Sequence, residues 1–336
     1  MNIGILGTGA IAAKHAEAWS NIGCKVVACS NRTLEKGQEF ASRFGCRFVS
    51  SPEDLCRDSA VELVDICTFP DYRVEPLEIC AELGKPAQVQ KPIATRLAEA
   101  HRIQELVSRT GITVGVVSQN RFNDSSQFLH EAITAGRLGR LLQLDAYVKW
   151  YRPPSYYSRP IKGSWKTEGG GALINQAIHQ VDLLRWFGGP VREVSARWQI
   201  GTLHKIESED LVNGLLSFSS GALGVIQAST AIWPGYPERI EVHGTKGSAI
   251  LTGNRFARWD VIDDTGPKPE LAGELASGSS DPMAISLTPF ERQFQDLLDA
   301  HRERRTPTVS VEDGTAALGI VEAVYESCRT GRNVEL

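Results

Sequence analysis

The sequence has no excess of positive charge, no long apolar run and no cysteine pair with C-x-x-C spacing. Its 336 residues carry a formal net charge of −4, so charge favours neither nucleic acid nor an anionic membrane as a partner. No apolar stretch approaches the length needed to span a bilayer. The N-terminus enters a predicted strand without a preceding basic and apolar segment, so we expect no signal peptide and a cytoplasmic location.

Cysteine is present in an odd number, which suits a disulfide framework poorly. Most of these cysteines fall in predicted strands or helices of the first third of the chain, so we expect buried free thiols in a reducing compartment. We also expect no metal site, because the spacing typical of zinc ligands is missing. The seven cysteines are Cys24, Cys29, Cys46, Cys56, Cys67, Cys80 and Cys328.

A glycine-rich turn follows the first apolar strand, as Gly7-Thr8-Gly9-Ala10-Ile11-Ala12. Gly7 permits a tight turn, Gly9 allows a pyrophosphate to approach the backbone, and Ala12 allows close packing of helix on strand. The predicted helix from Ile11 to about Asn21 offers its N-terminus to the phosphates. The turn therefore predicts dinucleotide contacts from Gly7 to Ile11, the alternative being an ordinary turn between strand and helix.

The first 120 residues alternate predicted strands and helices. Short apolar strands in this pattern are typical of a doubly wound parallel sheet, here a Rossmann-type dinucleotide-binding domain over residues 1–120. The intervening helices end at glycines placed as C-terminal caps. After the strand at residues 3–6, the predicted strands are 25–30, 47–50, 61–68, 87–90 and 112–117.

The pattern changes to mainly strands after residue 120. We expect residues 121–336 to form an α+β domain with a large, open, mainly antiparallel sheet, one face of which is free to cover something else. Helices are expected at 125–135, 289–302 and 312–328, and a mobile loop rich in Gly, Pro and Ser at about 264–281. The predicted strands are 141–150, 191–200, 211–218, 223–232, 239–243 and 248–251.

The second predicted strand ends in Ser30-Asn31-Arg32, where an NAD-specific site would place a carboxylate for the ribose 2′-hydroxyl. Ser30 can donate a hydrogen bond and Arg32 can pair with a 2′-phosphate, which favours NADP over NAD. The alternative is that Arg32 is solvated or stacks on adenine.

Gln90-Lys91-Pro92 follows the strand at 87–90, at the sheet edge where doubly wound folds bind ligands. A partly desolvated lysine there could orient a substrate hydroxyl or exchange a proton with it. The alternative interpretation is a surface lysine at a strand end.

Residues 169–171 are three glycines, and a helix is predicted directly after them. Asn175, His179 and Asp182 lie at i, i+4 and i+7 on one polar stripe of that helix. A histidine aligned with an amide and a carboxylate can move protons near neutral pH. Equally, Asp182 could hold His179 in a purely structural role.

A loop before the glycine run interleaves basic and aromatic side chains. Aromatic faces and forked donors suit a sugar ring, and the positive charge favours an anionic one, such as a uronate, sugar phosphate or nucleotide sugar. A solvated loop or an oligomer contact would show the same pattern. The loop contains Lys149, Trp150, Tyr151, Arg152, Tyr156, Tyr157, Arg159, Lys162, Trp165 and Lys166, and Trp233 to Tyr236 could add a further wall or simply connect two strands.

These motifs, in this order, resemble the Gfo/Idh/MocA family of glucose–fructose oxidoreductase and inositol dehydrogenase relatives. The E-K-P motif of that family matches residues 90–92, and its D-x-x-x-H motif matches residues 175–179. The resemblance implies a Rossmann domain followed by a domain with an open antiparallel sheet. It also implies hydride transfer between a nicotinamide cofactor and a sugar, cyclitol or related alcohol.

Carried over to this chain, the resemblance makes Lys91 and His179 the catalytic residues. It places Thr68 and Gln90 beside the cofactor, and Trp165 on the cofactor or substrate side. His179 would act as general acid/base, Lys91 would polarise the same substrate oxygen, and Asn175 would hold an adjacent hydroxyl. The expected substrate contacts are Lys91, Tyr151, Arg152, Tyr156, Trp165, Asn175 and His179.

Three departures from the family pattern affect the expected chemistry. Gln90 replaces the usual glutamate, Asn175 replaces the usual aspartate, and residues 69–73 replace the usual P-N-x-x-H. An enzyme of this fold that retains NAD and cleaves glycosides, or a non-catalytic nucleotide sensor, remains an alternative to a dehydrogenase. We expect a homodimer or homotetramer, because proteins of this resemblance commonly bury the open sheet against a twin subunit.

Overall fold

A computed structural model of the chain describes residues 1–159, 161–271 and 286–336. The chain divides into two compact units, residues 1–119 with 286–316 and residues 120–285 with 317–336. We expected one boundary at residue 120, with everything after it in the second domain. The structure instead groups residues 286–316 with the first unit, because helix α8 (Thr288–Glu303) packs against α1 (Ala10–Asn21).

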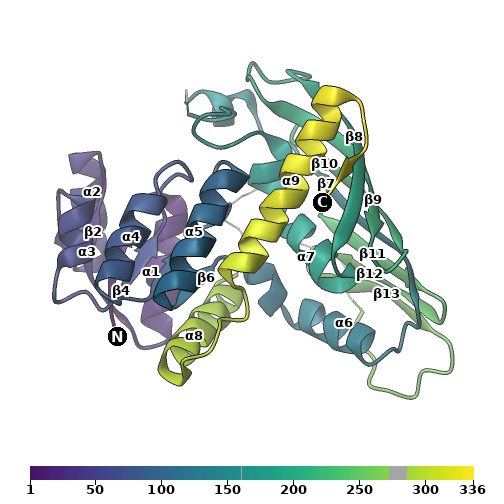
Figure 1. The fold of residues 1–336 in the computed structure, drawn as a ribbon, viewed down its shortest axis with the longest axis horizontal. Coiled ribbons are helices and arrows are strands. Elements are labelled where there is room, and N and C mark those ends of the chain that lie inside the picture. Colours follow the sequence, from purple (N-terminus) through teal and green to yellow (C-terminus); the bar gives the residue numbers. More distant parts are fainter. Residues whose placement is uncertain (160, 272–285) are drawn as a thin grey trace. The chain divides into compact units, whose positions relative to one another are not determined.

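The first unit contains a six-stranded parallel sheet with the order β3-β2-β1-β4-β5-β6. This is the order of a Rossmann fold, so the predicted doubly wound sheet is confirmed. Figure 1 labels β2, β4 and β6 of this sheet. The strands β4, β5 and β6 are buried along their whole length, as expected for a sheet covered on both faces. The strands are β1 (Asn2–Leu6), β2 (Lys25–Ser30), β3 (Arg47–Phe48), β4 (Leu63–Ile66), β5 (Ala87–Val89) and β6 (Val114–Val116).

Helices of the first unit form two groups against this sheet. Trp19 of α1 stacks on Phe294 of α8, with ring centroids 4.2 Å apart. The helices α3, α4 and α5 contact one another in a second group. As predicted, α2 and α5 end at glycines in the left-handed conformation, Gly45 and Gly111. The remaining helices are α2 (Leu34–Phe44), α3 (Pro52–Arg57), α4 (Val74–Glu82) and α5 (Leu97–Thr110).

The second unit contains an eight-stranded sheet with the order β13-β12-β11-β7-β10-β9-β8-β14. It is mainly antiparallel, as predicted, and β7 and β10 form its parallel pair. Sequence reasoning missed β13 and β14. The strands are β7 (Leu141–Lys149), β8 (Val191–Ile200), β9 (Glu209–Phe218), β10 (Leu223–Ser229), β11 (Arg239–Gly244), β12 (Gly247–Thr252), β13 (Arg255–Val261) and β14 (Val334–Glu335).

Strand register divides this sheet into a covered face and an open face. One row of paired residues is buried under helices, consisting of Ala196, Gly214, Ile226, Ala146, Ile240 and Leu251. The helices of this unit are α6 (Asp124–Thr134), α7 (Ile178–Gly188) and the part of α9 (Val311–Thr330) from residue 317 onward. The neighbouring row points to the opposite face and consists of Ser195, Leu215, Val225, Asp145, Glu241, Ile250 and Arg258.

The loop expected to be mobile is only partly described, since residues 272–281 lie outside the described residues. Its first part is held in place by Asp264, which accepts hydrogen bonds from Arg137 at 2.8 Å and from the Trp259 indole at 2.8 Å. The described beginning of this segment is therefore anchored at Asp264.

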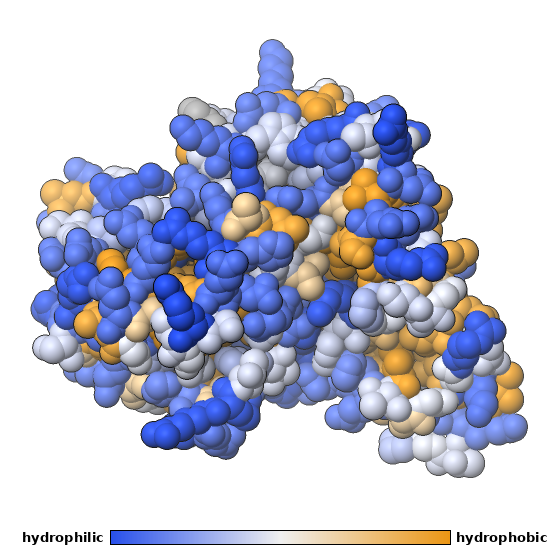
Figure 2. Space-filling model, viewed as in Figure 1, coloured by the Kyte–Doolittle hydropathy of each residue, from blue (hydrophilic) through white to orange (hydrophobic). Residues whose placement is uncertain are grey.

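Hydrophilic side chains cover most of the molecular face drawn in Figure 2, and apolar side chains form small groups between them. Within the described part of the chain, helices of membrane-spanning length and hydropathy do not occur. All seven cysteines are free thiols, and four of them are buried.

Candidate functional site

The glycine-rich turn between β1 and α1 has the geometry that a dinucleotide requires. Gly7 has a φ of +86°, and its N–H donates to the carbonyl of Ser30 at 2.8 Å. A Cβ on Gly7 would lie 2.9 Å from the backbone carbonyl of Cys67, so only glycine fits between β1 and the end of β4. The turn is therefore shaped by the close approach of three backbone segments.

Gly9 begins helix α1 and leaves the space beside it open. It is exposed, no heavy atom lies within 4 Å of a Cβ added to it, and no side chain caps the helix. The first turn of α1 contains no acidic residue, so its N–H groups and dipole are available to an anion. Ala12 is fully buried, as its predicted packing role requires. Of the other three turn residues, Ala10 is exposed, Ile11 is half-buried, and Thr8 donates its hydroxyl to the Lys36 carbonyl at 3.3 Å.

The end of β2 carries no carboxylate. The Ser30 hydroxyl is buried and has no hydrogen-bond partner among the described residues, which is unusual for a buried polar atom. Asn31 donates its side-chain amide to the Thr33 carbonyl at 3.3 Å, and Arg32 is exposed. A ribose hydroxyl or phosphate oxygen would satisfy Ser30, so these residues fit a dinucleotide.

A buried arginine joins the carboxyl ends of two strands at this edge. Arg73 donates to the backbone carbonyl of Gln90, at the end of β5, and to the carbonyl of Thr68 at 2.9 Å. Burial of the guanidinium lowers the pKa of Arg73 to about 9. The Thr68 hydroxyl in turn donates to the Tyr72 carbonyl at 2.7 Å. Arg73 thus ties the backbone at Thr68 to that at Gln90, a cross-link that sequence reasoning did not anticipate.

Lys91 is half-buried directly after Gln90. Its backbone N–H donates to Oε1 of the Gln90 side chain at 2.7 Å. The Gln90 side chain is itself buried and directed into the unit, where its amide nitrogen lies 3.0 Å from Nε2 of His15. Gln90 therefore acts through interior contacts, whereas we expected it to face the cofactor.

In the second unit, close contacts explain two of the three glycines before the expected catalytic helix. A Cβ on Gly171 would lie 1.8 Å from the backbone oxygen of Glu209. Gly170 has a φ of +151°, and a Cβ there would lie 2.3 Å from the Tyr325 hydroxyl. Any side chain at either position would push the start of this helix away from β9 and α9.

Glu209 stabilises the start of that helix by hydrogen bonds. Its carboxylate accepts from the N–H groups of Gly171 and Leu173, both at 2.8 Å, and from the Tyr325 hydroxyl at 3.0 Å. Burial raises the pKa of Glu209 to about 7, although these hydrogen bonds act in the opposite direction. The start of the helix is therefore hydrogen-bonded to a carboxyl group whose pKa is about 7.

We had expected a regular helix directly after the glycines, but the start of this helix is irregular. Residues Leu173–Ala177 form a π-helical turn, labelled η3, and α7 continues from Ile178. A π turn is wider than an α turn, and it replaces part of the regular α-helix on which the expected i, i+4 spacing of Asn175 and His179 was based. Asn175 donates its side-chain amide to the Gly170 carbonyl at 3.0 Å, and both Asn175 and His179 are half-buried.

Asp182 is committed to an arginine that sequence reasoning missed. Arg121 donates from Nε and Nη2 to the two carboxylate oxygens of Asp182, at 2.8 and 2.5 Å, and both residues are buried. The Arg121 guanidinium also lies over the Trp186 ring, 5.4 Å from its centroid. This forked ion pair anchors α7, so Asp182 has a structural partner other than the one we considered.

The basic and aromatic loop is only partly available to a ligand. Arg152 is 1% exposed and donates to Oε1 of Gln176 at 3.1 Å, and Gln176 donates to the Tyr156 hydroxyl at 3.1 Å. Lys162 pairs with the buried Glu168 at 2.5 Å. Two of the five positive charges in the loop are therefore used internally, which reduces the field available to an anionic substrate.

Tyr151 and Trp165 lie in separate contacts of the same unit. The Tyr151 ring meets Trp233 edge to face, with centroids 5.0 Å apart. The Trp165 indole donates to the Glu207 carbonyl at 2.8 Å and packs edge-on against Tyr325, with ring centroids 5.0 Å apart. Trp165 thus joins the group of residues, with Tyr325 and Glu209, that surrounds the start of the helix.

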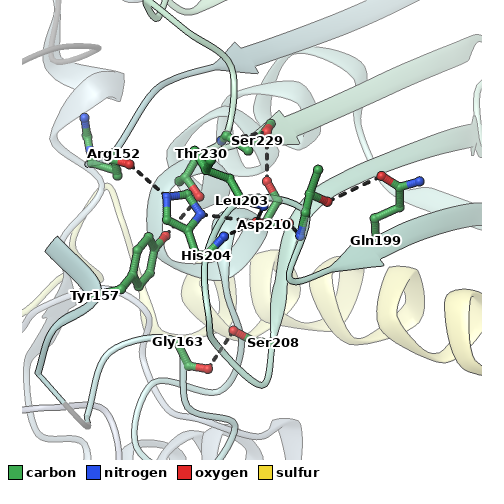
Figure 3. Close-up of polar contacts among 12 residues, drawn as sticks. Arg152, Tyr157, Gly163, Gln199, Leu203, His204, Ser208, Asp210, Ser229 and Thr230 are labelled. Carbon is green, nitrogen blue, oxygen red and sulfur yellow. Dashed lines mark hydrogen bonds and ion pairs between the residues drawn. The ribbon is translucent and has the colours of Figure 1, made fainter. Parts of the chain in front are cut away.

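A buried histidine–aspartate pair holds the backbone of the loop (Figure 3). His204 lies between Asp210, 3.2 Å from Nδ1, and the carbonyl of Arg152, 2.8 Å from Nε2. Asp210 also accepts from the backbone N–H groups of residues 202, 203 and 204. Although burial opposes it, these hydrogen bonds hold the pKa of Asp210 below its usual value. No periodic pattern marks this pair in the sequence, and its contacts show it supporting the loop.

Two clusters in the described residues have donor atoms close enough together to hold a metal ion, although we expected no metal. One consists of the buried His15, Asp65 and Cys67, and the other of Asp145, Glu241 and His243 on the open sheet face. In both, members are hydrogen-bonded to each other or to neighbouring side chains. Hydrogen bonding already accounts for both arrangements.

Two family models match successive parts of this chain. The model of the oxidoreductase family with an NAD-binding Rossmann fold matches residues 1–118, and that of the GFO/IDH/MocA C-terminal domain matches residues 126–250. These matches cover both halves of the architecture described above. The chain therefore belongs to the GFO/IDH/MocA family of oxidoreductases, and its first unit is an NAD-binding domain.

Curated relatives and solved structures match the chain over nearly its full length. It is 27% identical over 346 aligned residues to myo-inositol 2-dehydrogenase of Thermotoga maritima, covering 100% of this chain and 98% of the relative. It is 27% identical over 338 residues to 4-carboxy-2-hydroxymuconate-6-semialdehyde dehydrogenase of a Sphingobium strain, covering 97% and 99%. The crystal structure of the WlbA dehydrogenase of Bordetella pertussis, in complex with NADH and UDP-GlcNAcA, superposes with a TM-score of 0.87 at 27% identity, covering 100% and 98%. The protein is accordingly an NAD(P)-dependent oxidoreductase.

Proposed function

We propose that this protein oxidises a secondary alcohol of a sugar, sugar derivative or cyclitol, or reduces the corresponding ketone, by hydride transfer with a nicotinamide cofactor. The observation that carries the proposal is the placement of Lys91 at the carboxyl end of β5, on the sheet that carries the dinucleotide turn. The myo-inositol dehydrogenase among the relatives acts on a cyclitol, and WlbA was crystallised with a nucleotide sugar acid. Both ligands offer ring hydroxyl groups, which supports this substrate class.

Each half of the chain contributes a different part of the chemistry. A bound nicotinamide supplies the hydride acceptor or donor. Lys91 donates a hydrogen bond to the reacting oxygen and so stabilises negative charge developing there. His179 takes the hydroxyl proton during oxidation and returns it during reduction, and the Asn175 amide holds a neighbouring hydroxyl. The other ligand contacts we propose are those of Tyr151, Tyr156 and Trp165, whereas Arg152, expected as a contact, is 1% exposed and bonded to Gln176.

We propose that the cofactor is NADP in preference to NAD. Support comes from the missing carboxylate at the end of β2, the unpartnered buried hydroxyl of Ser30 and the exposed guanidinium of Arg32. A 2′-phosphate would accept hydrogen bonds from both side chains, whereas an unesterified ribose offers Arg32 no charge partner.

The direct test is a substrate panel of neutral sugars, uronates, sugar phosphates, nucleotide sugars and cyclitols. Absorbance of the reduced nicotinamide is followed with NAD and NADP in parallel, and each mixture is analysed for cleaved products. We expect net reduction of NADP with one class of substrate. Cleavage without net reduction would contradict the proposal and would indicate a glycosidase that retains its cofactor.

Two variants test the proposed roles of the side chains. Lys91→Ala and His179→Ala should each lower kcat by about 10²- to 10⁴-fold, because each removes a group that acts on the transferred charge or proton. Cofactor affinity, measured by quenching of intrinsic fluorescence, should stay close to that of the wild type. Near-normal turnover in either variant would remove that residue from the mechanism.

A further inference from the structure

The residue before Lys91 is fixed at four points. The Gln90 N–H donates to the Ile66 carbonyl at 3.0 Å, and its own carbonyl accepts from Arg73. Its side-chain Oε1 accepts from the Lys91 N–H, and its side-chain Nε2 faces Nε2 of His15 at 3.0 Å. Gln90 is 6% exposed, so these contacts are protected from competition by water.

The contact with Lys91 determines which way the Gln90 amide points. A backbone N–H can only donate, so the Gln90 atom that faces it must be the oxygen. The NH₂ group of Gln90 then faces His15, and Nε2 of His15 must accept its hydrogen bond. The histidine proton is consequently on Nδ1, which lies 2.9 Å from Oδ2 of Asp65.

The far end of this chain of contacts is rigid. Asp65 Oδ2 also accepts from the Trp19 indole at 2.7 Å, and the His15 ring packs against Phe290 and Phe294 of α8. His15, Asp65 and Trp19 are completely buried. The other titratable groups facing this network are Cys67, 3.3 Å from Nδ1 of His15, and Arg73. Neutral His15 is therefore hydrogen-bonded to the Asp65 carboxylate through Nδ1 and to the Gln90 amide through Nε2.

We propose that Gln90 is a positioning residue. The buried His15–Asp65 pair holds the Gln90 side chain, and that side chain holds the backbone N–H of Lys91 in place. This inference rests on the proposed function, in which Lys91 contacts the substrate oxygen. An amide suits the position because it donates to neutral His15 and accepts from Lys91 at the same time. A glutamate, the residue of the resembled motif, presents an acceptor to His15, so a hydrogen bond there needs an added proton.

The kinetic test compares Gln90, which directly follows β5, with Gln88, which lies within that strand. Gln90→Ala removes the link to Lys91, whereas Gln88→Ala removes a completely buried amide that makes no side-chain hydrogen bond in the described structure. We expect kcat to fall about 10- to 100-fold in Gln90→Ala, as for an imprecisely placed catalytic group, with the cofactor Kd unchanged. Gln88→Ala should keep its kcat. Equal kcat values in the two variants would overturn the proposal.

A spectroscopic test needs neither substrate nor activity. In wild-type protein labelled with ¹⁵N-histidine, the His15 signals, assigned by their loss in His15→Gln, should show Nε2 unprotonated and Nδ1 protonated. In Gln90→Glu, we expect Nε2 of His15 to become protonated, because the glutamate oxygen demands a donor. A protonated Nε2 in the wild type would refute the orientation of Gln90 inferred here.

Failure of this inference can be separated from failure of the proposed function. If Lys91→Ala loses turnover while Gln90→Ala and Gln88→Ala behave alike, Lys91 is catalytic and needs no positioning by Gln90. If Lys91→Ala keeps its turnover, the proposed role of Lys91 fails, and the NMR result alone then decides whether the hydrogen-bonded network is as described.

Discussion

Arg73 in the first unit and Glu209 in the second are buried ionisable side chains with shifted pKa values. Burial lowers the pKa of Arg73 to about 9 and raises that of Glu209 to about 7, in each case favouring the neutral form. Both residues hold backbone groups next to a proposed catalytic residue: Arg73 holds the carbonyl before Lys91, and Glu209 holds the turn that contains Asn175. These two buried ionisable side chains therefore hold backbone groups in position.

Cofactor choice is also decided by single residues. Arg32→Ala removes the one positive side chain among residues 30–32, so the Kd for NADP should rise by about tenfold or more, as expected for loss of a charged hydrogen bond. The Kd for NAD should change little. Titration of the intrinsic fluorescence with each cofactor measures both, with Arg43→Ala, an exposed arginine of α2 paired with Glu17, as the control. Equal losses for the two cofactors would contradict a contact with the 2′-phosphate.

At the scale of elements, the start of the proposed catalytic helix combines three features. The glycines at 170 and 171 allow contact with α9 and β9, a π turn replaces the first α turn, and Glu209 accepts hydrogen bonds from two buried N–H groups of the helix start. Unpaired N–H groups at a helix start need acceptors, and here a neighbouring strand supplies them. The helix start thus depends on the ionisation of a group outside the helix.

This dependence predicts an effect of pH on stability. The folded pKa of Glu209, about 7, lies above its usual value of 4.5, so the folded state keeps a proton that the unfolded state has lost. The contribution of Glu209 to the free energy of unfolding is therefore greatest below about pH 4.5 and is lost as pH rises to about 7. The difference in unfolding free energy between wild type and Glu209→Gln, measured with urea, should fall over that range. A difference that is constant with pH would show that Glu209 does not titrate as described.

Regular elements were well predicted from the sequence, whereas the site was predicted only in outline. The apolar and glycine pattern gave the parallel sheet, and β8 was predicted at residues 191–200, as observed. Strand β13 was missed because Arg255–Val261 mixes charged and aromatic residues without clean alternation, on a strand that is mainly exposed. The π turn and the burial of Arg152 depend on contacts with β9 and Gln176, which no local pattern records.

At the scale of the whole molecule, the open face of the eight-stranded sheet is the strongest indication of an oligomer. Leu215 and Leu223 on this face are 62% and 61% exposed, and neighbouring strands extend the surface around them. Exposed apolar side chains on a large sheet face favour burial against a second subunit. We therefore propose that the protein is a homodimer or homotetramer that uses this face.

Light scattering coupled to size-exclusion chromatography tests this proposal. The double variant Leu215→Glu/Leu223→Glu should run as a monomer of about half or a quarter of the wild-type mass, because it places unpaired charge in the interface. Leu83→Glu, an exposed position of the first unit, adds the same kind of charge elsewhere and should leave the mass unchanged. A monomeric wild type would rule out the oligomer.

The central claim is that hydride passes directly between a substrate carbon and the nicotinamide. The most direct measurement uses the substrate found in the panel, deuterated at the reacting carbinol carbon, and determines by mass spectrometry where the deuterium goes. The account predicts that one deuterium per turnover appears in the reduced cofactor and that the product ketone has lost it. Deuterium that is released to water, or retained in a product without labelling the cofactor, would contradict the account.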